Sequence, residues 1–315
     1  ALVASAGFAG MAAAEVSLDG SAELGIIGGD DALNNPSDAD PQFHTDIDVG
    51  FTLSGATDNG LTFGASIDLD DTPIANSTTQ GGESIFVSGA FGTVSAGDLD
   101  GAFDNALTEV AFGPGSIADD HTVHAGYSGN AGLDGLFDGQ IVRYDYTFGG
   151  FTLSGSAEID DNDASGSSDI FAIGGAYQAT LGGINWGFGA GYQTGEIGVG
   201  STGTVGQSAQ SNGGTPGDTA DADVYGVSAN AAFGNGFEAG VNYWDADIDV
   251  SGLGDQSVEH YSIGGAYTVG AISVGANYGE FDFENGGSND GFGISAAYDL
   301  GGGAEVQFGY GDSSS

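Results

Sequence analysis

Eight carboxylates lie in or beside residues 99–139, the longest segment that interrupts an otherwise regular sequence pattern. They are Asp98, Asp100, Asp104, Glu109, Asp119, Asp120, Asp134 and Asp138. Carboxylates gathered around a narrow passage attract cations and repel anions. A long segment without regular structure inside a compact domain is usually a functional loop. We therefore expect residues 99–139 to fold inward and to narrow a pore.

The acidic loops also offer oxygen ligands of the kind that calcium prefers. The candidate calcium ligands are Asp119, Asp120, Asp160, Asp161 and Asp163. The sequence has neither the spacing of an EF-hand loop nor a glycine-rich calcium-binding nonapeptide repeat. We expect no required cofactor, and calcium is the one metal ion for which the sequence offers candidate ligands.

Other chemistry has little support in the sequence. His121 and His124 are three positions apart, but a zinc site needs three or four convergent ligands. We therefore expect both histidines to be exposed to solvent. No nucleophile elbow, phosphate-binding loop or dinucleotide motif stands between a strand and a helix. The sequence therefore predicts that the protein is not an enzyme.

Composition excludes several classes of protein. The 315 residues include one basic and 45 acidic residues, for a net charge of −44, and no cysteine. Nucleic acid is excluded as a partner, because binding phosphates requires Lys and Arg. Disorder is excluded, because the 19 Phe and 12 Tyr recur with a regular period. No apolar run reaches the roughly 18–20 residues that a transmembrane helix needs.

The regular pattern is an alternation of apolar and polar residues. In residues 45–54, Ile47, Val49 and Phe51 alternate with polar residues, and the same pattern resumes in residues 61–70. Asn59-Gly60 lies between the two runs, which is a strong signal for a β-hairpin. Successive side chains of a strand point to opposite faces. We expect the polar face of nearly every strand to be wet and the apolar face to meet lipid.

Fifteen such runs are predicted as strands. They are residues 16–28, 45–56, 61–70, 84–91, 93–98, 141–148, 151–159, 169–180, 184–194, 223–233, 237–249, 257–269, 272–282, 291–300 and 304–312. Short glycine-rich turns alternate with long acidic loops along the chain. Phe148, Phe151, Phe233 and Phe237 lie beside the short turns. This asymmetry and the aromatic residues are typical of a transmembrane antiparallel β-barrel with a water-filled lumen.

The ends of the sequence suggest processing and a further strand. Residues 1–14 are small and apolar and end in Ala12-Ala13-Ala14, which indicates the remnant of a secretory signal peptide. We expect Glu15 to begin a single barrel domain over residues 15–315, exported through the periplasm. Bacterial barrels have even numbers of strands, so we expect a sixteenth strand after Ser315.

Three segments carry a resemblance to a known family. They are EVSLDGSAELGI, FTLSGATDNGLTFGASIDLDD and SIFVSGAFGTVSAGD. The chain resembles the general porins of Rhodobacter-type alphaproteobacteria over nearly all of residues 15–315. The resemblance implies a sixteen-stranded, homotrimeric diffusion channel in the bacterial outer membrane. Its partners would be outer-membrane lipid and lipopolysaccharide, with small hydrophilic solutes passing through. The third external loop, here residues 99–139, would form the constriction.

The sequence departs from that family in its charges. Such porins usually set a basic cluster against an acidic loop, but this sequence offers only Arg143. Alternation places Arg143 and Asp145 toward the lumen, just after the long loop. With so little opposing charge, we expect a cation-preferring pore. The alternative is a secreted acidic Gly/Asp-rich structural or adhesive β protein that could bind calcium.

Overall fold

The computed structural model describes residues 15–29, 41–72, 77–114, 124–136, 140–159, 169–198, 205, 219–250, 254–284 and 286–314. The chain divides into two compact parts, residues 1–99 and residues 100–315. In the described residues, no helix is long and apolar enough to cross a membrane.

The first part contains five antiparallel strands that pair in sequence order. They are β1 (Glu15–Ile27), β2 (Gln42–Ala56), β3 (Thr62–Thr72), β4 (Ser77–Gly89) and β5 (Gly92–Asp98). The predicted runs match these strands, but β4 begins at Ser77 rather than at residue 84. Polar residues such as Ser77 and Thr79 pair with the end of β3, so backbone pairing extends the strand beyond the apolar alternation.

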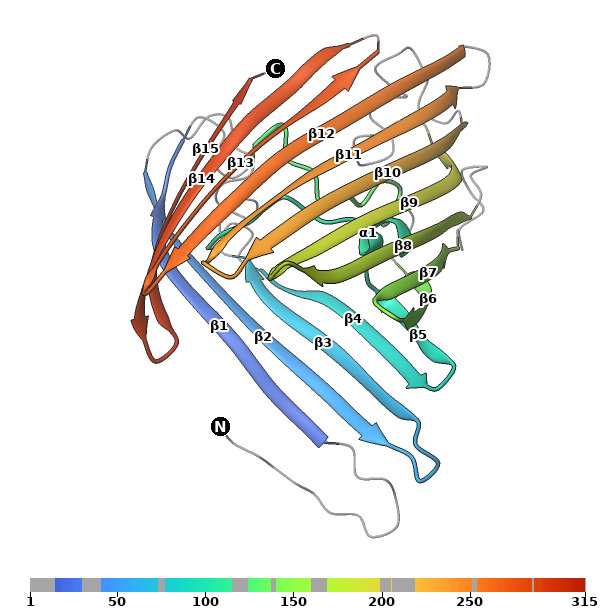
Figure 1. The fold of residues 1–315 in the computed structure, drawn as a ribbon, viewed down its shortest axis with the longest axis horizontal. Helices are drawn as coiled ribbons and strands as arrows, with labels where there is room; N and C mark the ends of the chain where they lie inside the picture. The colour runs from blue at the N-terminus through green and yellow to red at the C-terminus, as the bar shows by residue number, and fades with distance from the viewer. Residues whose placement is uncertain are drawn as a thin grey trace. The chain divides into compact units, whose positions relative to one another are not determined.

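The second part contains ten strands, each paired antiparallel with its neighbour in sequence (Figure 1). They are β6 (Gln140–Phe148), β7 (Phe151–Glu158), β8 (Ile170–Leu181), β9 (Ile184–Gly198), β10 (Thr219–Phe233), β11 (Phe237–Val250), β12 (Gly254–Val269), β13 (Ile272–Phe283), β14 (Gly287–Gly301) and β15 (Ala304–Ser314). The described residues of the two parts thus contain 15 strands, which confirms the number predicted from the sequence.

One short helix, α1 (Ala102–Ala106), lies within the segment that was predicted to have no regular structure. Phe103 on this helix is fully buried. The helix contacts β7, β8 and β9, and Figure 1 shows it beside β8 and β9. Five residues are too few for a helix to be stable alone. The contacts with the sheet therefore stabilise this turn of helix.

The two faces of the sheet differ along β6 to β15. We call the face on which α1 lies the loop-side face and the opposite one the outer face. The outer face exposes large apolar side chains, such as Val227 at 53%, Val241 at 48% and Ile263 at 57%. An apolar surface of this extent marks contact with lipid or protein. The rings of Phe148, Phe151 and Tyr177 cluster beside the short turns, with centroids 5.8 and 4.3 Å apart.

The sequence predicted a loop-side face that is polar along the whole length of the strands, but the structure shows a face that is polar only in part. Near the short turns it carries buried Ser228, Asn242 and Ser262. Near the other ends of the strands it carries an apolar cluster, in which Val224, Ile248 and Val258 are 0–1% exposed. The prediction failed there because period-two alternation separates two faces but does not say which face is buried.

Candidate functional site

The segment between β5 and β6 is fastened to the loop-side face by its own backbone. Ala102 N donates to Ser156 Oγ of β7 at 2.8 Å, and Thr108 N donates to Ser228 Oγ of β10 at 2.8 Å. Ala125 N donates to Ser313 Oγ of β15, also at 2.8 Å. Buried N–H groups without partners are costly. The serines of the sheet therefore fix the path of this segment across the second part of the chain.

Long polar side chains of the sheet hold the remainder of the segment. Gln193 Oε1 accepts from Leu133 N at 2.7 Å, and Glu158 Oε2 accepts from Gly135 N at 2.9 Å. Asn242 Nδ2 donates to Thr108 O at 3.1 Å and to the Asn130 side chain at 3.0 Å. Because Asn242 contacts residues 108 and 130 together, it ties the two described stretches of the segment, 100–114 and 124–136, to one another.

Glycines of the sheet allow the segment to lie directly against it. A Cβ atom at Gly174 would lie 1.9 Å from Ala102 O, and one at Gly189 would lie 2.0 Å from Ala106 O. Real Cβ atoms essentially never come this close to another atom. The backbone of α1 therefore approaches β8 and β9 where those strands lack side chains.

Two predicted carboxylates occupy partly buried positions in this segment. Asp134 accepts from Gly101 N at 2.8 Å and from Gln193 Nε2 at 2.5 Å. Burial nevertheless raises the pKa of Asp134 to about 7. Burial, and then the nearby carboxylates of Asp100 and Glu109, raise the pKa of Asp104 to about 8. Both groups therefore change charge near neutral pH.

Arg143 is the one basic side chain of the sequence, and it lies beside the start of this segment. Its Nε forms an ion pair with Asp145 Oδ2 at 3.0 Å, and its Nη1 donates to Asp100 O. Asp145 also accepts from Ser154 Oγ at 2.6 Å. The neighbours of Arg143 in β6, Val142 and Tyr144, are exposed on the outer face. Arg143 is therefore paired locally, and its charge lowers the pKa of Asp104 less than burial and the neighbouring carboxylates raise it.

The other predicted site residues are distributed differently. Glu109 accepts from the Tyr127 hydroxyl at 2.7 Å. Asp98 lies in the first part of the chain, where it lines a cavity with Asp19, Asp68 and Glu83. Asp119, Asp120, Asp138, Asp160, Asp161 and Asp163 lie outside the described residues. Among the residues that are described, no group of three or more His, Asp or Glu is placed to hold a metal ion.

Two histidines have a role that the sequence did not reveal. His124 was expected to be exposed, but it is 4% exposed and its Nε2 lies 3.1 Å from Asn277 Oδ1. His260 of β12 is fully buried, with Nε2 3.1 Å from Gly126 O. Burial lowers the pKa of His124. Both histidines hold residues 124–126 against the sheet, and His121 lies outside the described residues.

Comparison with known proteins places this arrangement in a family. The family model described as Gram-negative porin matches residues 1–315. A porin of Rhodobacter capsulatus is 28% identical over 95% of this chain and 94% of its own length. The family match supports a channel protein rather than an enzyme, and nothing in these comparisons supports a secreted structural or adhesive protein.

Solved structures show the same fold. A porin refined at 1.8 Å resolution has a TM-score of 0.66 and 23% identity, with 95% of this chain and 94% of that chain covered. OmpT, an outer membrane protein of Vibrio cholerae in its trimer form, has a TM-score of 0.63 and 16% identity over 95% and 89%. An anion-selective porin from Comamonas acidovorans has a TM-score of 0.64 and 15% identity over 95% and 89%. The predicted class, an all-β antiparallel barrel of the porin type, is confirmed.

Three observations support the same assignment. They are the apolar outer face of the sheet, the segment bound to its other face and the family match along the whole sequence. The chain belongs to the Gram-negative porin family and is a channel protein of the bacterial outer membrane.

Proposed function

We propose that the protein is a passive diffusion channel that prefers cations, and that residues 99–139 form its constriction. One observation carries the proposal. The segment fastened to the loop-side face presents Asp104, Glu109 and Asp134, while the single basic side chain, Arg143, is already paired with Asp145. At roughly 10 Å, one carboxylate lowers the energy of a cation by about 1–2 kcal/mol at an effective dielectric constant near 20. Several carboxylates together therefore enrich cations in a narrow passage.

The proposal extends to the assembly and its partners. OmpT of Vibrio cholerae, which shares this fold, is described in a trimer form, and we propose a homotrimer for this protein. The exposed apolar outer face supports contact with outer-membrane lipid and with lipopolysaccharide. Calcium held by the acidic loops is part of the same proposal, since Lys and Arg are not available to meet lipopolysaccharide phosphates.

Reversal potentials in planar bilayers under a KCl gradient test the ion preference. The wild-type channel is expected to give the sign of a cation-selective pore. Measured at pH 9, where Asp104 with its pKa of about 8 is mainly ionised, the double variant Asp104→Asn, Glu109→Gln removes two charges from the loop-side segment and is expected to move the reversal potential toward zero. Arg143→Ser is expected to increase the cation preference modestly.

A matched control separates the site from the overall charge. Asp247→Asn with Asp249→Asn also removes two charges, but both residues are exposed on β11 on the outer face. This control is expected to change the reversal potential far less. An anion-selective wild-type channel, or equal shifts in the two double variants, would contradict the proposal.

A further inference from the structure

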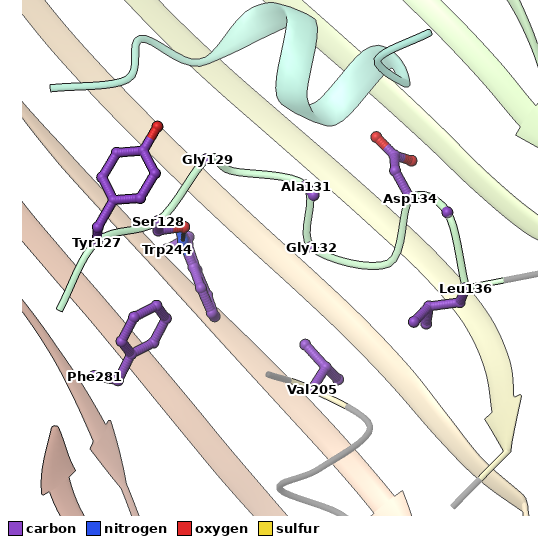
Figure 2. Close-up of a pocket in the computed structure, with 11 residues that line it drawn as sticks. Tyr127, Ser128, Gly129, Ala131, Gly132, Asp134, Leu136, Val205, Trp244 and Phe281 are labelled. Carbon is purple, nitrogen blue, oxygen red and sulfur yellow. Dashed lines mark hydrogen bonds between the residues drawn. The ribbon is translucent and has the colours of Figure 1, made fainter. Parts of the chain in front are cut away.

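A cavity of about 230 Å³ lies between the 124–136 stretch and the sheet (Figure 2). Trp244 of β11 and Phe281 of β13 form its floor, and Leu136 and Val205 line one side. Ser128 and Ala131 line it from the segment above. An apolar cavity of about 150 Å³ is already large enough to hold benzene. This cavity therefore has room for one six-membered ring with a small substituent.

The floor of the cavity is rigid. Trp244, His260 and Phe281 lie directly opposite one another on three adjacent strands. The centroid of the His260 ring lies 5.4 Å from that of Trp244 and 4.5 Å from that of Phe281. The three side chains are 0–6% exposed. An aromatic surface fixed in advance binds a flat ring without losing side-chain freedom.

One polar group in the cavity can select a ligand. Ser128 Oγ accepts from Trp244 Nε1 at 3.0 Å and from Asn130 N at 3.1 Å. These two bonds use the lone pairs of the oxygen, so the hydroxyl proton can be donated to a third group. The Ser128 hydroxyl beside the apolar floor of Trp244 and Phe281 fits a ring that carries one hydrogen-bond acceptor.

The surroundings oppose negative charge in the ligand. Asp134 lines the cavity, but Figure 2 shows its carboxylate pointing toward α1 and away from Trp244. That carboxylate already accepts from Gly101 N and Gln193 Nε2. The described residues that line the cavity include no Lys or Arg, and the chain has 45 acidic residues. An anionic ligand would therefore lose its hydration without gaining a positively charged partner.

We infer that this cavity binds a single-ring aromatic solute that carries a hydrogen-bond acceptor and no negative charge. The ring would lie on Trp244 and Phe281, with its substituent toward Ser128. Passive diffusion of ions needs no such site, so the inference stands apart from the proposed cation preference.

Tryptophan fluorescence tests this binding in the folded, full-length protein. The chain has two tryptophans, Trp186 and Trp244, so Trp186→Phe leaves Trp244 as the only reporter. Titration with benzyl alcohol is expected to give a saturable change with a dissociation constant on the order of 1 mM, the range of small fragments. Benzoate is expected to give none. A linear response to benzyl alcohol, or saturation by benzoate, would overturn the inference.

Two further variants in the Trp186→Phe background locate the site. Ala131→Leu adds a side chain into the cavity and is expected to weaken benzyl alcohol binding at least tenfold. Ala125→Leu makes the same change at an exposed position of the same stretch that does not line the cavity, and is expected to leave binding within twofold. If the two variants titrate alike, the ligand is not bound in this cavity. Far-ultraviolet circular dichroism of each variant confirms folding. If Ala131→Leu fails to fold, Leu136→Phe replaces it with the same expected loss.

Discussion

Apolar and polar or small residues alternate along the whole length of strands β9 to β13. The outer face is apolar near the short turns and polar near the other ends of the strands, and the loop-side face changes in the opposite sense. In the half of β11 near the short turn, Val241 is exposed on the outer face and Asn242 is buried on the loop-side face. In the other half, Asp247 is exposed on the outer face and Ile248 is 1% exposed on the loop-side face. The exchange occurs at Tyr243 and Trp244.

The exchange shows that each strand serves two environments. On the outer face, Tyr243 of β11 lies directly opposite Tyr261 of β12, and Tyr225 of β10 lies opposite Asp245, two residues further along β11. Tyrosine is favoured where hydrocarbon meets water. A membrane-spanning strand needs only about 9–11 residues, whereas β10 and β11 have 15 and 14. Beyond the tyrosines, the strands resemble those of a water-soluble sheet, with a buried core that includes Phe103 and Leu133 of the described stretches 100–114 and 124–136.

The largest expected effect comes from placing a charge in that core. Ile248→Asp would bury a carboxylate without a partner and is expected to lower the free energy of unfolding by about 3–5 kcal/mol. Asp247→Ile, one residue away on the outer face, is expected to change it by no more than about 0.5 kcal/mol. Guanidinium titration of the detergent-folded protein measures both. Similar losses would show that the faces do not differ at this end.

A smaller effect is expected where the segment touches the sheet. Gly174→Ala would place a Cβ 1.9 Å from Ala102 O, whereas the nearest atom to a Cβ at Gly175 is Leu153 Cδ2 at 3.5 Å. Gly174→Ala is therefore expected to cost about 1–3 kcal/mol and to displace α1. Limited proteolysis should then cut faster within residues 99–139. Gly175→Ala should leave the cleavage rate unchanged, and equal rates in both variants would contradict the close contact.

The strands could be predicted because their signals are local. Period-two alternation and pairs such as Asn59-Gly60 act over a few residues, and the resulting strand number is confirmed. The position at which the segment between β5 and β6 contacts the sheet could not be predicted in this way. Ser156, Gln193 and Asn242 look like ordinary polar residues of a wet face, and only the long-range register brings them to residues 102, 133 and 130.

The sequence pattern also did not predict which face of the strands is buried at each end, for a related reason. Ala222 and Val224 alternate with Asp221 and Asp223, and this pattern fits either assignment of faces. The choice depends on what covers each face, which is set by a segment far away in the sequence. One signal was present: acidic residues and tyrosines share one register in β10 and β11, so that register cannot be lipid-facing throughout.

A charge on the lipid side of the exchange is expected to have a moderate effect. Val241→Asp would place a carboxylate on the apolar part of the outer face, where acidic residues cost up to about 2 kcal/mol. Asp249→Val, on the same face beyond Tyr243, is expected to change stability by no more than about 0.5 kcal/mol. Folding equilibria in lipid vesicles measure both. If Val241→Asp costs nothing, the membrane boundary does not lie at Tyr243.

The smallest expected effect is a dependence of ion preference on pH, and it arises on the covered face of the sheet. The pKa values of Asp104 and Asp134, about 8 and about 7, lie above the usual range of carboxylates because burial disfavours their charged forms. At pH 6 both groups are mainly neutral, and at pH 9 both are mainly ionised. The cation preference should therefore rise between pH 6 and pH 9, whereas solvated carboxylates with pKa values near 4 keep their charge throughout.

Reversal potentials under a KCl gradient, measured at intervals across this range, test the effect. Asp104→Asn should remove the upper part of the change and leave the part near pH 7 in place. His124, with a pKa lowered by burial, is already neutral at pH 7 and above, so His124→Asn should leave the profile unaltered there. A flat wild-type profile would mean that Asp104 and Asp134 are in contact with solvent, and hence that the segment is not held against the sheet as tightly as its hydrogen bonds indicate.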